Sequence, residues 1–239
     1  MDRYIKREVK PTLSAVKLHL GVHADGDVIF DWQEITLPGR ANYRLVGATA
    51  IVRGNDGAAQ DCPMDLMFAK KSTTPQSIGT QNGAMAPTAN PYYNDIIGGL
   101  KLDATDYSDQ VQISMGSTTV VESGECPIIF EASATGSNKF YVAATANSGA
   151  PNFDSNTAVT VNYGAASASL ITLDGTSALL NLAPGDVVRA QDEAVMGTIN
   201  TVDSATQITL TAANTAAIAD GDLVYRLSPI TLKLTFERT

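Results

Sequence analysis

Along most of this chain, apolar and polar residues alternate with a period of two. The alternation is clear in runs such as YRLVGATAIVRG, MDLMFAK, KFYVAAT and ITLKLTF, and clusters of Gly, Pro, Asn and Asp separate the runs. A period of two places successive side chains on opposite faces of a β-strand, so that one face can be buried. Many short strands with turn signals between them are typical of sandwiches and barrels. We therefore predict an all-β fold, namely an antiparallel, jelly-roll-like β-sandwich.

Few segments are expected to be helical. Residues 2–9 could form a short helix, and Pro11 would end it because the residue before a proline is biased away from the helical conformation. One further helical turn is possible in residues 89–100, ANPYYNDIIGGL. The run SAVKLHLGV, residues 14–22, alternates and therefore predicts a strand.

The C-terminal third of the chain changes character. Residues 173–227 contain short alternating runs with turn signals at 184–186, 203–204 and 221–222, which predicts a small β-barrel near the lower size limit for independent folding. The final run, ITLKLTF, is expected to pair with AVTVNY, residues 158–163. The sequence therefore predicts a main sandwich of residues 1–172 and 228–239, with the barrel of residues 173–227 inserted near the C-terminus.

The connection from residue 71 to residue 97 is unusually long and is rich in Pro, Gly, Asn, Thr and Ser. Compact domains seldom contain a structureless loop of this length unless it is functional or ordered by a partner. Two interpretations remain open: a mobile surface loop, or an arm that lies across a neighbouring subunit. Apolar residues that could anchor such an arm are Ile78, Met85, Tyr92 and Tyr93.

The chain is acidic and carries little charge. Its net charge is −9, and charged residues make up 17% of it, below the usual quarter, which favours a surface that is easily desolvated at a subunit contact. Nucleic-acid binding is disfavoured because it needs clustered Lys and Arg. No apolar run approaches the roughly 20 residues of a membrane span. The first residues lack the apolar segment of a secretory signal, so we expect synthesis in the cytoplasm. Basic residues gather only near the N-terminus, at Arg3, Lys6, Arg7 and Lys10.

No catalytic constellation is evident, and we predict neither an enzyme nor a cofactor. His19 and His23 lie in a run expected to be a strand, where residues four apart stand about 13 Å apart, which disfavours a shared metal ion. Asp103, Asp106 and Asp109 loosely resemble a calcium loop, but the required Gly and bidentate Glu are missing. Solvated turn residues are the preferred interpretation, with a structural calcium ion as the alternative.

Three further side chains favour burial over chemistry. Cys62 and Cys126 each precede a proline at the edge of a strand-like run, and buried free thiols are preferred, although a disulfide between them stays open. Trp32 is the only tryptophan and lies in VIFDWQEITL. Burial beside Phe30 is favoured over a role in a carbohydrate-binding platform, because large aromatic side chains dominate cores.

Residues Met196 to Leu227, which contain GTINTVDSATQITLTAANTAAIADGDLVYRL, resemble small β-domains of virion proteins from tailed bacteriophages. The stretch DWQEITLPGRANYRLVGATAIVRGNDG, residues 31–57, is similar to head or tail proteins of marine and cyanobacterial phages. The resemblance implies a structural virion subunit. A capsid decoration (cement) role is preferred to a tail or baseplate role, and the chain is short for a major capsid protein.

These observations lead to two main hypotheses. In the first, a capsid decoration protein stabilises the head: residues 1–11 and 71–97 reach over neighbours, the basic N-terminal residues meet an acidic capsid surface, and the barrel projects outward. Its partners would be the major capsid protein or other virion subunits, and it would be a dimer or trimer in virions assembled in the host cytoplasm. The second is a receptor- or glycan-binding module at the tail, with exposed aromatics such as Trp32 and Tyr93. A hydrolase is disfavoured by the lack of paired titratable groups.

Overall fold

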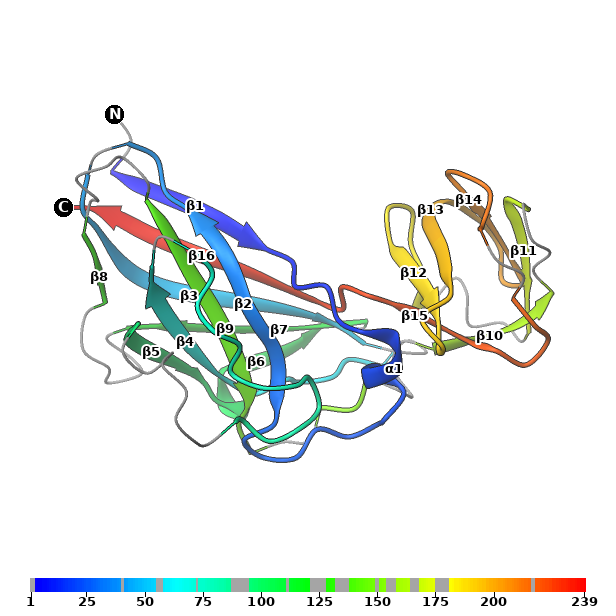
Figure 1. Ribbon diagram of the computed structural model, residues 1–239, viewed down its shortest axis with the longest axis horizontal. Coiled ribbons are helices and arrows are strands. Elements are labelled where there is room, and N and C mark those ends of the chain that lie inside the picture. Colours follow the sequence, from blue (N-terminus) through cyan, green and yellow to red (C-terminus); the bar gives the residue numbers. More distant parts are fainter. Residues whose placement is uncertain are drawn as a thin grey trace.

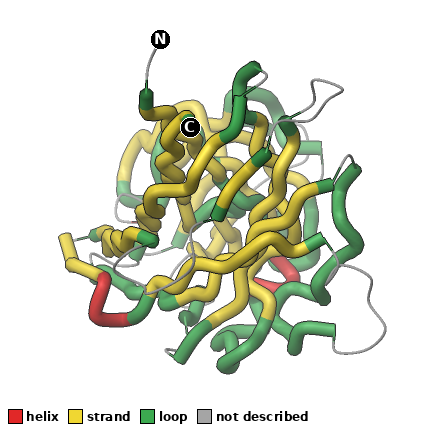
Figure 2. Tube along the Cα trace, turned by 90° about the vertical axis from the view of Figure 1, so that its left-hand side faces the viewer, coloured by secondary structure: helices red, strands yellow, loops and turns green. Residues whose placement is uncertain are grey.

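The computed structural model consists almost entirely of β-strands, arranged as two stacked sheets and a separate barrel (Figure 1). Figure 2, viewed from the sandwich end, shows that strands dominate and that helical pieces are short. Among the described residues, no helix is long and apolar enough to cross a membrane. The structure describes residues 3–39, 41–54, 58–71, 73–86, 95–110, 112–120, 128–131, 138–148, 151–153, 158–163, 168–174, 181–215 and 218–239.

The first sheet of the sandwich is antiparallel, with strand order β1-β16-β3-β7-β6. Its strands are β1 (Tyr4–Val9), β16 (Ile230–Arg238), β3 (Tyr43–Arg53), β7 (Ile113–Thr119) and β6 (Tyr107–Gln110), and the short β8 (Ile129–Phe130) also pairs with β3. The second sheet has the order β2-β9-β4-β5, with β2 (Val28–Thr36), β9 (Lys139–Ala146), β4 (Met64–Lys70) and β5 (Ile96–Leu102).

The strand order is that of a jelly roll. When β1, β2, β3, β4, β5, β7, β9 and β16 are numbered one to eight in chain order, the two sheets read 1-8-3-6 and 2-7-4-5. This interleaving of early and late strands is the double Greek-key pattern of jelly rolls. The prediction of an all-β, jelly-roll-like sandwich is therefore confirmed.

The core between the sheets follows from the alternation of each strand. In β16, for example, Ile230, Leu232, Leu234 and Phe236 point inward and are fully buried. Phe130 lies at the centre of an aromatic cluster, with its ring 4.6 Å from Phe140 and 5.2 Å from Phe236 in edge-to-face geometry. Edge-to-face pairs of this kind each add about 1 kcal/mol beyond the burial of their surface.

A six-stranded antiparallel barrel follows the sandwich strand β9 and precedes β16. Each strand pairs with two neighbours in the closed order β10-β11-β14-β13-β12-β15. The barrel has an apolar core of its own, which includes Val188, Met196, Ile208 and Val224. Its strands are β10 (Ala158–Tyr163), β11 (Leu170–Leu173), β12 (Val187–Ala190), β13 (Val195–Ser204), β14 (Gln207–Leu210) and β15 (Leu223–Arg226).

Two sequence expectations about this barrel are corrected. AVTVNY forms β10 and pairs with β11 and β15, not with the final strand β16. The predicted boundary at residue 173 thus falls inside the barrel, because β10 and most of β11 precede it. Alternation alone shows that a run is a strand but not which sheet it joins.

The N-terminal segment also differs from the prediction. Residues 4–9 form the strand β1, not a helix, and β1 is paired in full with β16. The expected strand of residues 14–22 instead contains the short helix α1 (Ala15–Leu18), in which Ala15 and Leu18 are buried. A spacing of three residues puts both side chains on one helical face. In the sequence this helical spacing was masked by the apolar and polar alternation of the surrounding residues.

A described part of the long connection, residues 73–86, lies along the outer face of the second sheet. Ile78 is fully buried there with Val28, Trp32 and Tyr141, and Met85 packs against the same cluster. Backbone bridges join Gln81 to β2 at Val28 and Ala84 to Asp27. The predicted anchors Ile78 and Met85 therefore contact the chain's own sheet, while Tyr92 and Tyr93 lie outside the described residues.

Candidate interaction surfaces

The strand β15 contributes to two cores at once. Val224 points into the barrel core. On the opposite face, Tyr225 is fully buried in the sandwich cluster, and Leu223 packs against that cluster. The connection to β16 is pinned by backbone hydrogen bonds from Leu13 N to Leu227 O (2.7 Å) and from Leu227 N to Val187 O (2.9 Å). The barrel is therefore packed against the sandwich and is not tethered by a free linker (Figure 1).

Arg226, the last residue of β15, lies at the base of the barrel and is only 1% exposed. Its Nη2 donates to the carbonyl oxygens of Arg53 (2.9 Å) and Gly54 (2.5 Å), and its Nη1 donates to that of Asn181. Burial, together with the nearby positive charge of Arg53, lowers the pKa of Arg226 to about 9, whereas Asp186 opposes this shift. One guanidinium thus joins the end of β3 in the sandwich to the barrel segment before β12.

A partly buried ion pair lies beside this guanidinium. Nη1 of Arg53, at the end of β3, is 2.5 Å from a carboxylate oxygen of Asp186, which precedes β12. The other Asp186 oxygen accepts a hydrogen bond from Ala183 N (2.8 Å), which holds the turn before β12. The ion pair therefore links the sandwich to the barrel turn of residues 183–186, which is itself held by the hydrogen bond from Ala183 N to Asp186.

The helix α1 lies between the long connection and the barrel and contacts both. On the side of the long connection, Gln81 Oε1 accepts from Ser14 N (2.8 Å), and Asn82 Nδ2 donates to Lys17 O and Gly21 O (3.3 Å each). On the barrel side, Glu193 Oε1 accepts from the Ser14 hydroxyl and from Val16 N (3.2 Å). A four-residue helix is too short to be stable alone, so these contacts hold it in place.

The carboxylate of Glu193, a barrel residue, caps the start of α1 by accepting hydrogen bonds from Ser14 and Val16. Glu193 sits in the turn between β12 and β13 with a φ of 68°, and its other oxygen pairs with Arg189 (2.9 Å). Burial alone would raise the pKa of Glu193, but the hydrogen bonds from Ser14, Val16 and Arg189 outweigh burial and hold the pKa below its ordinary value. The contact therefore depends on the ionised carboxylate.

The two histidines have separate surroundings. His19 Nδ1 lies 2.9 Å from the Tyr225 hydroxyl, at the junction with the barrel. His23 is fully buried, lies 3.3 Å from Pro151 O through Nδ1 and packs edge-on against Phe153. Burial lowers the pKa of His23. Within the described ranges, no group of three or more His, Cys, Asp or Glu side chains has the geometry to hold a metal ion.

The outer face of the first sheet is lined largely by hydroxyl and charged side chains, and its residues are exposed or half-buried. Register places Lys6, Thr235, Gly47 and Thr119 in one row across β1, β16, β3 and β7. The next row contains Ser117, which donates to Thr49 Oγ1 (3.0 Å). We call this surface the open face; its outward side chains are Lys6, Glu8, Thr49, Ile51, Met115, Ser117, Thr119, Thr231, Lys233 and Thr235.

A depression of about 220 Å³ lies on the open face, between the row of Gly47 and the row of Thr49. It surrounds Gly47, which has no side chain to fill it, and Thr49, Ser117, Thr119 and Thr235 are among the residues that line it. Glycine is required at this position, because a Cβ would lie 2.6 Å from the carbonyl oxygen of Thr118 on β7. The hollow is therefore a product of the close approach between β3 and β7.

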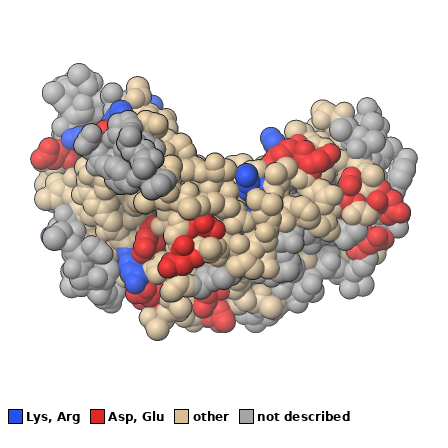
Figure 3. All heavy atoms as spheres, turned by 60° about the horizontal axis from the view of Figure 1, so that its bottom comes forward, with Lys and Arg blue, Asp and Glu red and all other residues tan. Residues whose placement is uncertain are grey.

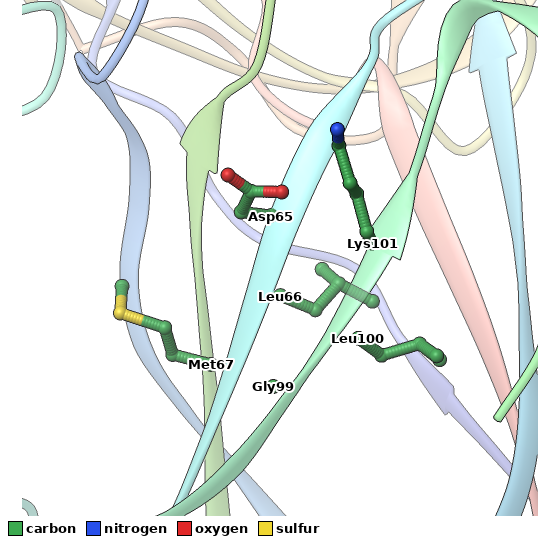
Figure 4. A pocket seen from close by; sticks show the side chains of 6 residues that line it. All are labelled: Asp65, Leu66, Met67, Gly99, Leu100 and Lys101. Carbon is green, nitrogen blue, oxygen red and sulfur yellow. The ribbon is translucent and has the colours of Figure 1, made fainter. Parts of the chain in front are cut away.

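A second pocket, of about 370 Å³, lies over β4 and β5 (Figure 4). Gly99 is paired with Met67 and leaves a gap in the surface, and Asp65 is paired with Lys101 one row further along. Both charged groups already have partners within the chain: Asp65 accepts from Asn147 Nδ2 (3.2 Å), and Lys101 pairs with Asp103 (2.9 Å). The pocket therefore offers mainly backbone and aliphatic surface.

The predicted basic arm is part of the first sheet. Arg3 forms an ion pair with Glu237 on β16 (2.5 Å), and Arg7 Nε donates to Thr36 O (2.7 Å), which ties β1 to the end of β2. Lys10 pairs with Glu8 (2.9 Å), and Lys6 points outward on the open face. The expectation that residues 1–11 form a free arm is therefore wrong for residues 3–11.

The other predicted residues have structural explanations. Trp32 is buried, as expected, but it packs with Val28 on the outer side of the second sheet, whereas Phe30 lies in the sandwich core, because bulges interrupt β2. Its indole nitrogen donates to Gln76 O (2.9 Å). Cys62 is a buried free thiol whose pKa is raised by burial, and Cys126 lies outside the described residues.

The acidic triplet fits the preferred interpretation as turn residues. Asp103 and Asp106 form a reciprocal capping box around the single 3₁₀ turn Ala104–Asp106, in which Asp106 accepts from Asp103 N (2.8 Å). Asp109 is exposed on β6. Asp103 and Asp106 therefore shape a turn at the start of β6, whereas Asp109 lies within the strand itself.

Comparisons with known proteins give no further guide, because no family model, curated protein or solved structure matches this chain. Sequence reasoning missed the residues that join the two parts, above all Arg226, Glu193 and Gln81. Only Arg226 has a visible signal: it is the one charged residue in the apolar run LVYRL, and a charge in such a run indicates a buried, hydrogen-bonded group.

Proposed function

We propose that this chain is a structural virion protein, and specifically a capsid decoration protein, that acts through contacts with neighbouring subunits and not through catalysis. The observation that carries the proposal is the way the molecule is divided: the jelly-roll sandwich has one partly covered face and one open face, and a small barrel is packed onto its end. Such a body has distinct surfaces held at fixed relative positions, as a subunit that bridges neighbours requires.

The rigid junction supports a role in assembly for an energetic reason. Ordering loops and side chains at an interface subtracts from binding free energy, so a body that is already rigid docks at lower cost. Arg226, the Arg53–Asp186 pair and the Glu193 cap of α1 provide that rigidity here. Many identical copies on one particle would then multiply a modest contact through avidity.

Two further features agree with the proposal. Jelly rolls occur in viral capsid proteins and in lectin-like domains, so the fold is compatible with both hypotheses drawn from the sequence. The resemblance of residues 196–227 and 31–57 to phage virion proteins favours the virion. Trp32 is buried and hydrogen-bonded to the chain's own Gln76, which disfavours its part in the aromatic platform of the glycan-binding alternative, while Tyr93, the other residue of that platform, lies outside the described residues.

The test is the location of the protein on intact particles. A short epitope inserted at the exposed turn Asp220–Gly221 of the barrel would be labelled with gold-conjugated antibody on purified virions. Regular labelling over the head is the expected result. Labelling confined to the tail tip would replace the decoration role by the tail or baseplate role, and absence from purified virions would refute both.

A further inference from the structure

We infer that the open face is the docking surface of this protein and that its partner is a flat, acidic surface of a different protein subunit. This inference rests on the proposed function, because it names the chemistry of the partner within the particle. It starts from the contrast between the two sheets. Residues 73–86 cover the part of the outer side of the second sheet formed by β2 and β9 and bury Ile78 there, whereas the outward side chains of the first sheet are exposed or half-buried.

The chemistry of the open face suits burial against protein. Its centre is rich in hydroxyl side chains, and two of them, Ser117 and Thr49, are hydrogen-bonded to each other. Covering hydroxyl groups that remain hydrogen-bonded costs little, whereas covering unpaired charges costs much. Ile51 and Met115 add apolar surface in the adjacent row. The charged residues Lys6, Glu8 and Lys233 lie on β1 and β16, on one side of the face, where they correspond to the polar rim of a protein interface.

The charge of this region identifies the partner. The charged side chains of the open face are Lys6, Lys233 and Glu8, a net charge of +1, although the whole chain has a net charge of −9. The segments that carry them, residues 3–10 and 230–239, contain six basic and two acidic residues. Among the described residues, the side chains of Lys6 and Lys233 make no ion pair. A basic region on an acidic protein steers it toward acidic surfaces and away from basic ones.

A second copy of the chain fits this surface less well, although its barrel is also acidic. Residues 158–227 contain seven acidic and two basic residues, and the acidic side chains are visible on the barrel at the right of Figure 3. The barrel, however, is a closed and strongly curved sheet, and a flat sheet buries little area against a curved one. The open face spans four strands, and with spacings of about 4.8 Å between strands and 3.3 Å per residue it covers roughly 500 Å².

The area of the open face limits which partner surfaces can cover it. A standard protein interface buries about 800 Å² on each partner, so the open face reaches this size only if it is covered whole and if side chains at its β1 rim take part. A partner of low curvature is therefore required. The hollow at Gly47 would then lie near the centre of the contact, where a side chain of the partner could fill it.

Zero-length carbodiimide cross-linking of intact virions, followed by mass spectrometry, tests the inference and identifies the partner in the same experiment. The reagent joins a lysine amine to a carboxylate in direct contact. We expect links from Lys6 or Lys233 to acidic residues of another virion protein. Links to other proteins only from Lys101 and Lys139, which lie on the second sheet, would overturn the inference, as would links from Lys6 and Lys233 only to the barrel of another copy.

A pair of matched variants gives an independent measurement. Lys6→Gln with Lys233→Gln removes two charges from the open face, and Lys101→Gln with Lys139→Gln removes two from the second sheet. Heads stripped of this protein would be re-occupied with each purified variant, with urea midpoints measured alongside as a check on folding. We expect about a tenfold loss of affinity for the first variant only, and a weaker dependence on salt.

Equal affinities for the two variants, or a larger loss for the second-sheet variant, would refute the docking surface. A protein that is present on virions but docks through its second sheet would leave the proposed function intact and remove only this inference. A protein absent from virions would remove both, so the two failures are distinguishable.

Discussion

Replacing Arg226 by methionine should loosen the junction between sandwich and barrel. Methionine keeps the length of the side chain and its apolar stem but removes the donors to Arg53 O, Gly54 O and Asn181 O. Three hydrogen bonds from a charged group are worth about 1.5–3 kcal/mol each, which gives a gross loss of roughly 4.5–9 kcal/mol. The buried charge disappears at the same time, and this opposes the loss.

The size of that offset follows from the pKa of Arg226, which burial lowers from 12.5 to about 9. At about 1.4 kcal/mol for each pKa unit, the charge is unfavourable by roughly 5 kcal/mol in the folded state. The net expectation for Arg226→Met is therefore a destabilisation of about 2 kcal/mol. Because the contacts are local, amide hydrogen exchange around residues 13–21 and 181–190 should accelerate about 30-fold, in keeping with the same free energy.

The assay combines hydrogen exchange with urea unfolding followed by the fluorescence of Trp32, which reports on the sandwich alone. Arg44→Met is the matched control, since Arg44 is half exposed and pairs with Glu237 at the other end of β3, and Glu237 keeps Arg3 as a second partner in this variant. The reasoning fails if Arg226→Met is as stable as Arg44→Met, or if its exchange accelerates evenly over the whole molecule.

Three further predictions concern other parts of the structure. Because the folded pKa of Glu193 lies below its ordinary value, its contribution to the free energy of unfolding is complete above about pH 4.3 and is lost as pH falls through the folded pKa. The NMR shift of the Val16 amide should therefore titrate below pH 4.3 and should stay constant in Glu193→Gln. Gly47→Ala should lower the free energy of unfolding by about 1–3 kcal/mol, since its Cβ would meet Thr118 O at 2.6 Å; an unchanged urea midpoint would show that β7 shifts freely. Deleting residues 1–9 should cost about 3 kcal/mol through the lost burial of Val9 and Ile5 and the lost pairing of β1; an unaltered melting temperature would mean that β1 is not bound to β16 in solution.

The sequence predicted the fold class well because the two-residue alternation is a local signal. Runs such as ITLKLTF become strands whose inward residues fill the core, as β16 shows. The pairing of strands is not local, and this is where prediction failed. AVTVNY and ITLKLTF have the same pattern, yet the first closes the barrel and the second lies between β1 and β3.

The surfaces were harder to predict than the fold. Ile78 and Met85 were expected to anchor an arm on a neighbouring subunit, but both pack against the chain's own second sheet, because composition does not tell which surface an apolar residue contacts. Glu193 looks like an ordinary turn residue, and its role depends on Ser14, which is 179 residues away. The open face could not be recognised from a sequence motif, because its residues come from strands that are distant in the sequence and meet only through their pairing in the sheet.

The position of β16 has a consequence for how the chain folds during its synthesis. This strand ends at residue 238, yet it lies between β1 and β3 and pairs with both. Until β16 has been synthesised, β1 has no strand to pair with. During this time β3 exposes a row of unpaired backbone groups, which can pair with other nascent chains. Completion of the first sheet must therefore await the synthesis of β16, and contacts across more than 200 residues make that step slow. A chain without β16 would lose the strand that joins β1 to β3.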